Sequence, residues 1–145
     1  MSFLYLRYLL ISNNWLFLFR YAEGTGAAAN FKYISDLVFL SSTRLLAADI
    51  SNNCLRLIDL VNNPPSTTRF AGFCVNGGSE QGHRLDKARL DRPFKMDIDT
   101  SDSTVYFVEK VSLNLRKINL TTDDVVTVRN FAEPHTQILY YNNML

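Results

Sequence analysis

AADISNNCLRLIDL, at residues 47–60, returns as FVEKVSLNLRKINL at residues 107–120, sixty positions later. An acid stands at the third position of each stretch, as Asp49 and as Glu109. Four further positions hold identical residues, which are Leu55 and Leu115, Arg56 and Arg116, Ile58 and Ile118, and Leu60 and Leu120. Self-similarity at a fixed period indicates a fold built from stacked structural units.

The similarity continues upstream of both stretches. Residues 29–39 align with residues 88–98 at a shift of fifty-nine, and Ala29 falls opposite Ala88. The shift changes by one residue within a polar turn, where a repeat tolerates insertion. The chain therefore carries two tandem units.

Each unit contains four short apolar or β-branched runs separated by polar turn residues, a pattern typical of β-strands. Several runs are apolar at consecutive positions, which predicts sheets covered on both faces. Stacked four-stranded units are typical of propeller blades. We therefore predict an all-β fold, a partial β-propeller built of four-stranded antiparallel blades. The predicted strands span residues 35–40, 44–48, 54–60 and 67–71, then 95–100, 105–109, 113–120 and 125–129.

Over about residues 22–131 the two units resemble the NHL repeats. Ile34 stands where the family has proline, and Glu109 where it has aspartate. The matching positions of the second unit are Gly78, Gly82, Ala88, Leu90, Pro93, 107–109 and 114–118, and those of the first are Gly24, Gly26, Ala29, Phe31, 47–49 and 53–58. The resemblance implies NHL-like blades, in which the recurring arginines Arg56 and Arg116 are a structural regularity.

Two blades cannot close a ring that usually needs about four to eight. The chain is therefore expected to be a slice of a larger propeller or a truncated gene product. Because each end of such a slice exposes an apolar face and strand edges, the isolated chain is expected to self-associate. The predicted units are residues 1–23 as a remnant of a preceding blade or a leader, 24–72 and 73–130 as blades, and 131–145 as the start of a further blade.

The sequence does not decide whether the chain is exported from the cell. Arg7 interrupts the first apolar run, so residues 1–20 are interpreted as strands of the preceding blade rather than a signal peptide, and no run reaches the ~20 residues of a membrane helix. Export is the alternative, in which case the triplet Asn119-Leu-Thr121 becomes a sugar acceptor. Cys54 and Cys74 can form a bridge, but without proven export we expect free buried thiols.

Catalytic and metal-binding patterns are not found in the sequence. His83 and His135 lie in separate connecting segments without clustered ligands, so we expect no metal and no cofactor. Asp49 is interpreted as an acid that accepts backbone N–H groups of the turn at residues 50–52. Arg56 and Arg116 are each expected to reach the acid of their own unit. No enzymatic activity is predicted.

The connection between the units, from Cys74 to Lys87, is the expected binding segment, because binding residues concentrate on loops above a rigid scaffold. Its candidate binding residues form a basic rim of His83, Arg84, Arg89 and Arg92. The alternative, favoured by the net charge of +1, is that Asp86 and Asp91 neutralise these residues.

Three functions follow from these patterns. The preferred one is a non-enzymatic scaffold that presents its loops to a protein partner. The second is a surface for single-stranded RNA, which requires cations and aromatic rings on one face. The third is a fragment of a propeller enzyme, which the fold alone neither supports nor opposes.

Overall fold

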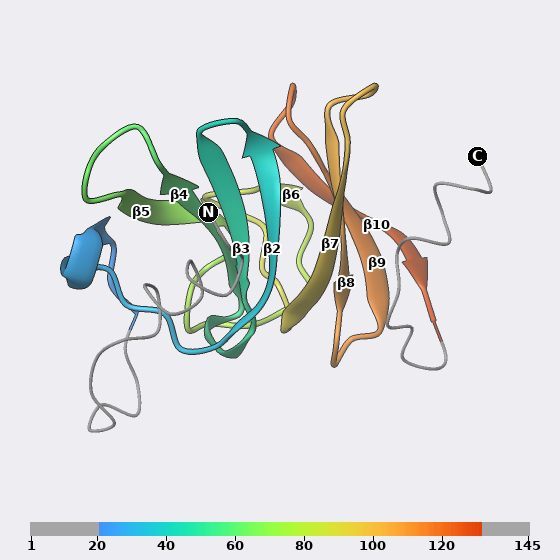
Figure 1. Cartoon of the computed structure of the whole chain (residues 1–145). Coiled ribbons are helices and arrows are strands. Elements are labelled where there is room, and N and C mark those ends of the chain that lie inside the picture. Colours follow the sequence, from blue (N-terminus) through green and yellow to red (C-terminus); the bar gives the residue numbers. More distant parts are fainter. Residues whose placement is uncertain (1–20, 132–145) are drawn as a thin grey trace.

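The computed structural model of the chain describes residues 21–131. The units predicted at residues 1–23 and 131–145 therefore lie almost entirely outside the described residues. The described chain forms ten strands in two antiparallel five-stranded sheets, with only two short 3-10 turns, at Gly26–Ala28 and Ile50–Asn52 (Figure 1). The prediction of an all-β fold is confirmed at this level.

The first sheet has the strand order β1-β5-β4-β3-β2 and the second the order β6-β10-β9-β8-β7. All eight predicted strands are present, within two residues of their predicted ends. The first sheet contains β1 (Gly24–Thr25), β2 (Ile34–Ser41), β3 (Arg44–Asp49), β4 (Cys54–Asp59) and β5 (Ser66–Ala71). The second contains β6 (Gly82–His83), β7 (Pro93–Asp99), β8 (Thr104–Glu109), β9 (Asn114–Asn119) and β10 (Asp124–Asn130).

The two-residue strands β1 and β6 were not predicted, because Gly-Thr and Gly-His carry no strand pattern. Each pairs with the last strand of its own sheet, β1 with β5 and β6 with β10. Each short strand therefore covers an edge that would otherwise present unpaired backbone groups.

The sheet register preserves the sixty-residue repeat. Ala47 lies opposite Arg56 in the first sheet, and Phe107 lies opposite Arg116 in the second. Leu45 and Ala47 belong to a different apolar cluster from Leu46 and Ala48, although all four are buried. Burial at consecutive positions confirms that this strand is covered on both faces.

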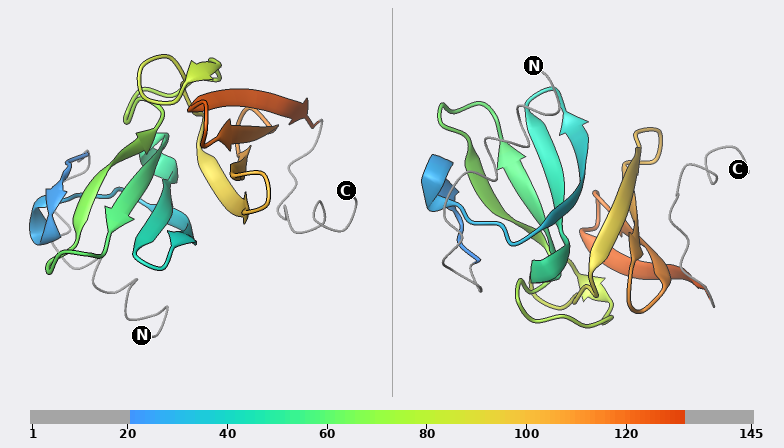
Figure 2. Two further views of the ribbon diagram at one scale, coloured as in Figure 1. Left: turned by 90° about the horizontal axis from the view of Figure 1, so that it is seen from above. Right: turned by 60° about the horizontal axis from the view of Figure 1, so that its bottom comes forward.

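The two sheets share one apolar core, and they lie face to face with β2 beside β7 (Figures 1 and 2). The Asp36 carboxylate accepts a 2.9 Å hydrogen bond from the Met96 N–H and lies 3.6 Å from Lys95 Nζ. The first sheet contributes Leu46, Ala48, Leu55, Phe70 and Ala71 to the core, and the chain from residue 88 onward contributes Ala88, Leu90, Met96, Val105, Phe107, Ile118 and Val125. Within residues 21–131 no helix has the length and apolar content needed to cross a membrane.

Candidate functional site

Each sheet contains one buried arginine–carboxylate pair, at the positions that recur in the sequence. Arg56 Nη1 lies 3.4 Å from Asp49 Oδ2, and Arg116 Nη1 lies 2.9 Å from Glu109 Oε1. All four side chains are 0% exposed. The prediction that each arginine reaches the acid of its own unit is confirmed. Since these acids have no access to solvent, they are closed to a substrate.

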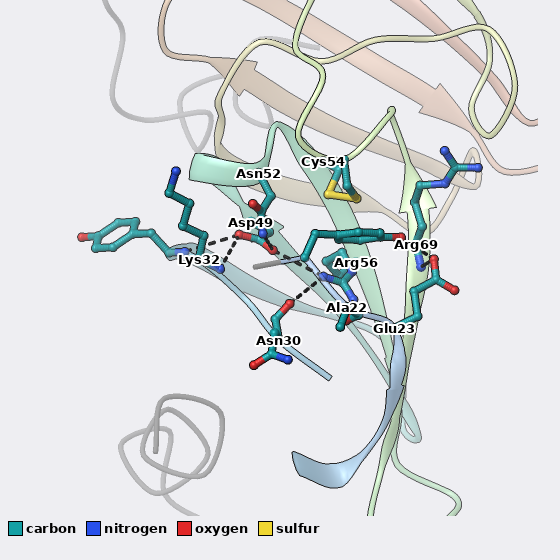
Figure 3. The surroundings of a disulfide bond; sticks show 12 residues. Ala22, Glu23, Asn30, Lys32, Asp49, Asn52, Cys54, Arg56 and Arg69 are labelled. Atoms are coloured by element: carbon teal, nitrogen blue, oxygen red, sulfur yellow. Dashed lines mark hydrogen bonds and ion pairs between the residues drawn. A yellow bond between two sulfur atoms is a disulfide. The ribbon is translucent and has the colours of Figure 1, made fainter. Parts of the chain in front are cut away.

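Each guanidinium also binds the segment that precedes the first long strand of its sheet, β2 or β7. Arg56 donates to the carbonyls of Ala22, at 2.7 Å, and Asn30, at 3.1 Å (Figure 3). The rings of Tyr21 and Phe31 lie 4.5 and 4.9 Å from the same cation. The arginine therefore fixes both ends of the chain that leads into β2.

Arg116 repeats this arrangement in the second sheet. It donates to the carbonyls of Glu80 and Arg89, each at 2.8 Å. These two residues bracket the later part of the connection between the sheets. The recurring arginine therefore fixes the segment in which binding residues were predicted.

The predicted role of Asp49 is wrong in its detail. Its Oδ1 accepts the backbone N–H groups of Lys32 and Tyr33, at 3.2 and 3.4 Å, and its Oδ2 accepts the Asn52 side chain at 2.8 Å. The turn at residues 50–52 is instead closed by its own backbone, with the Asn53 N–H donating to the Ile50 carbonyl at 3.3 Å. The carboxylate therefore binds the backbone of the segment before β2, and it contacts the turn only through the Asn52 side chain.

Burial dominates the electrostatics of the first pair. It raises the pKa of Asp49, and the hydrogen bonds from Asn52, Lys32 and Tyr33 and the charge of Arg56 offset only part of the rise. Burial likewise lowers the pKa of Arg56, against the opposing effect of Asp49. Desolvation of two charges opposes the formation of a buried ion pair. The hydrogen bonds that surround Asp49 and Arg56 therefore help to stabilise the pair.

The two cysteines form a disulfide between Cys54, at the start of β4, and Cys74, in the connection, with their Cα atoms 5.0 Å apart (Figure 3). The expectation of free thiols is therefore wrong. The sequence placed both residues near strand ends, but only the packing of the connection onto β4 brings them within bonding distance. The bridge fixes the first part of the connection to the first sheet.

The four residues of the predicted basic rim do not lie together in the structure. His83 and Arg84 lie beside β10. His83 Nδ1 lies 2.8 Å from Asp86 Oδ1, so Asp86 does lie beside this part of the rim. Arg84 Nε lies 2.6 Å from Asp123 Oδ1, and its Nη1 donates to the Phe70 carbonyl at 2.6 Å. The bond from Arg84 lowers the pKa of Asp123. Arg84 therefore links β5 to the turn before β10 and is largely a structural residue.

Arg89 and Arg92 lie elsewhere, between the connection and β7. Arg89 donates to Asn76 Oδ1 at 2.9 Å, and its Nε lies 3.9 Å from Glu80. Arg92 is exposed, and no acid of residues 21–131 forms an ion pair with it. Asp91 forms no ion pair within the same residues, so its predicted role as a neutralising acid is not seen.

Sequence reasoning missed Asn53, which joins three loops. Its Oδ1 accepts the Arg92 N–H at 3.1 Å, and the Arg92 carbonyl accepts the Lys110 N–H at 3.0 Å. A Cβ atom on Gly77 would lie 3.0 Å from Asn53 Cγ, so only glycine fits there without displacement. The side chain of Asn53 thus binds the segment before β7 directly and reaches the turn after β8 only through Arg92.

Val75 is the most unusual backbone position of the connection. It is a β-branched residue at φ 65°, a conformation that such residues rarely adopt, and its side chain is 64% exposed. Its N–H donates to the Asn52 carbonyl at 2.7 Å, next to the disulfide. Strained residues held in this way concentrate at functional sites. We call Val75, Asn76, Arg89, Arg92 and Lys110 the connection surface.

Metal binding receives no support from the geometry of the described chain. Among residues 21–131 no group of three or more His, Cys, Asp or Glu side chains lies close enough together to hold a metal ion.

Comparison with known proteins does not assign a family. No family model and no curated protein matches the chain. Among solved structures, a structural genomics protein of unknown function from Bacteroides thetaiotaomicron VPI-5482 is similar, with 16% identity and a TM-score of 0.37. The match covers 81% of this chain but only 36% of that one, so this chain spans about a third of its length.

Proposed function

We propose that the chain is a non-enzymatic segment of an NHL-like β-propeller and that it serves as a protein-interaction scaffold. The proposal is supported by two units that have the same strand order and the same register and that share a core. It is supported further by the recurring acids, Asp49 and Glu109, which are enclosed with their arginines and support loops rather than react.

The observation that carries the proposal is the connection surface. A disulfide, the Asn53 side chain and Arg116 hold this segment in place, and an exposed apolar residue, Val75, stands on it. Arg92 and Lys110 add two exposed cations that have no ion-pair partner within residues 21–131. A rigid surface with an apolar contact and cations that form no ion pair within residues 21–131 suits a protein partner, since little entropy is lost when it binds.

Single-stranded RNA suits this surface less well. The rings of Phe73 and Phe94 already have one face occupied by the cations of Arg89 and Lys110, at 5.6 and 5.4 Å, which leaves less ring surface for bases. The net charge of +1 adds no long-range attraction. RNA is therefore an outcome of the test rather than a second proposal.

Photo-crosslinking tests the proposal with the full chain in the cells that express it. A photoreactive residue replaces Ser79, which is exposed on the connection, or Ser42, which is exposed in the hairpin between β2 and β3. We expect discrete protein adducts from position 79 and none of the same mass from position 42. Identical adducts from both positions, adducts to RNA, or no adduct at all would contradict the proposal.

Charge reversal then tests the surface itself. The double variant Arg92→Glu and Lys110→Glu is expected to lower the yield of the adduct about tenfold, since each exposed pair contributes up to about 1 kcal/mol. The matched control is Lys87→Glu, which reverses an exposed cation of the same connection outside the connection surface. An unchanged yield in the double variant would remove Arg92 and Lys110 from the binding surface.

A further inference from the structure

We propose that Asn119 is an N-glycosylation site and that the chain passes through an oxidising secretory compartment. The triplet Asn119-Leu120-Thr121 satisfies the acceptor rule, with no proline at its middle position. Since such triplets also occur by chance, the inference depends on where the structure places this one and on the chemistry of the rest of the chain.

The triplet lies at an exposed hairpin. Asn119 is the last residue of β9, and the chain turns through residues 120–123 before β10 begins (Figure 1). Thr121 and Thr122 are exposed, and Asn119 is partly exposed. A hairpin turn at the rim of a sheet is open to a bulky transferase and leaves room for a sugar.

The hydrogen bonds of Asn119 turn its reactive nitrogen outward. Its Oδ1 accepts the backbone N–H groups of Thr121, at 2.8 Å, and Thr122, at 3.1 Å. Nδ2 has no hydrogen-bond partner within residues 21–131 and is not among the buried side-chain atoms left without one. The nitrogen that would carry the sugar is therefore open to solvent, and Oδ1 can keep both hydrogen bonds after modification.

The disulfide supports export independently. The chain has two cysteines, and both are consumed in the bridge between Cys54 and Cys74. Structural disulfides persist in the secretory pathway and outside the cell, and they are rare where thiols are kept reduced. The compartment that suits this bridge is the compartment in which acceptor triplets are modified.

The modification is a group transfer without a redox step. Asn119 Nδ2 attacks the anomeric carbon of a lipid-linked oligosaccharyl diphosphate, and an N–C bond forms. The C–O bond to the diphosphate breaks, and its electron pair leaves with the lipid diphosphate. Nδ2 loses one proton to a base of the transferase. The side chain remains an amide with one N–H.

The attachment point at Asn119 lies at the opposite end of β9 from the Lys110 end of the connection surface. Asn119 ends β9, whereas Lys110 lies before the turn that begins it, so the length of the strand, about 20 Å, separates the two. The inference therefore does not rest on the proposed function. Loss of the sugar and loss of protein binding are separate outcomes.

The test uses the full chain, produced behind an added cleavable signal in a eukaryotic secretory host and separately recovered from its natural source. We expect a discrete mass that an endoglycosidase removes, in the original chain and in Thr121→Ser. The matched variants Thr121→Ala and Asn119→Gln are expected to lose it completely. Secreted chain with its disulfide formed but without the removable mass would overturn the proposal, as would naturally expressed chain without a sugar.

Discussion

At the residue scale, one arginine in each unit organises the segment that enters its sheet. A guanidinium offers five donors in a planar fork, so it can serve a carboxylate and two carbonyls together. Arg56 does this with Asp49, Ala22 and Asn30. A lysine at this position carries three donors on one atom and cannot span the same three acceptors.

Removal of the second arginine is expected to be costly. In Arg116→Ala the buried carboxylate of Glu109 loses its counter-charge, and the carbonyls of Glu80 and Arg89 lose their donor. We expect a loss of about 3–5 kcal/mol in the free energy of unfolding, measured by urea denaturation. The control is the exposed Arg129→Ala, expected within about 0.5 kcal/mol of the original chain. Equal effects in the two variants would contradict this role.

Because of Tyr21, we expect the stability of the folded chain to fall at alkaline pH. Burial, with the hydrogen bond to Glu23, raises its pKa from 10.0 to about 12. A group whose pKa is raised on folding contributes its full stability below pH 10.0 and loses it as the pH rises to about 12. Melting temperatures recorded across this range should fall in the original chain. The melting temperature of Tyr21→Phe should fall less steeply over the same pH range. Tyr33 is exposed, so the melting temperature of Tyr33→Phe should fall as steeply as that of the original chain.

At the element scale, the connection between the sheets is held at several points along its length. The disulfide fixes its start, the Asn53 side chain packs closely against Gly77, and Arg116 binds the carbonyls of Glu80 and Arg89. Long connections without their own secondary structure are usually functional or disordered. This one is neither paired into a long strand nor loose, which is the arrangement expected of a binding loop.

Removal of the disulfide should destabilise the chain through this element. Cys54 and Cys74 are 20 residues apart, and closure of such a loop contributes about 3 kcal/mol in the chain-entropy treatment. We expect Cys54→Ser with Cys74→Ser to lower the free energy of unfolding by about that amount in urea denaturation. The original chain under a reducing agent is the control and should lose a similar amount. No loss in either would show that the bridge is dispensable.

At the scale of the whole molecule, the shared core should make the two sheets unfold together. Phe107 is 0% exposed between them, and Phe107→Ala is expected to cost about 3–5 kcal/mol. Native-state hydrogen exchange should then accelerate in β3 and β4 as well as in β8 and β9. Exchange that rises only in the second sheet would show that the sheets are stable separately.

Self-association is the second prediction for the whole molecule. Under the proposed NHL-like propeller, two sheets cannot close a ring that usually needs about four to eight blades, so a sheet face remains to be covered by a second copy. We expect sedimentation velocity to show a mass that grows with concentration. A monodisperse monomer across the concentration range would contradict the open-propeller proposal.

Most of the strands could be predicted from local sequence patterns. Each strand is specified by its own apolar run and by the turn residues beside it, so all eight main strands were predicted from the sequence. The pairing of Arg56 with Asp49 was also predictable, because the two residues occupy adjacent strands joined by a short turn. The two-residue strands β1 and β6 were not, since they owe their conformation to β5 and β10.

The sequence by itself determined the two units, their strands and the acid–arginine pairs, because these depend on residues close together along the chain or on a period that can be counted. Only the tertiary structure decided the disulfide, the division of the basic rim and the place of Asn53. Cys54 meets Cys74 across 20 residues, and Arg92 meets Asn53 across 39. Such contacts form only when the connection folds back over the first sheet, and no pattern local to either partner encodes that path.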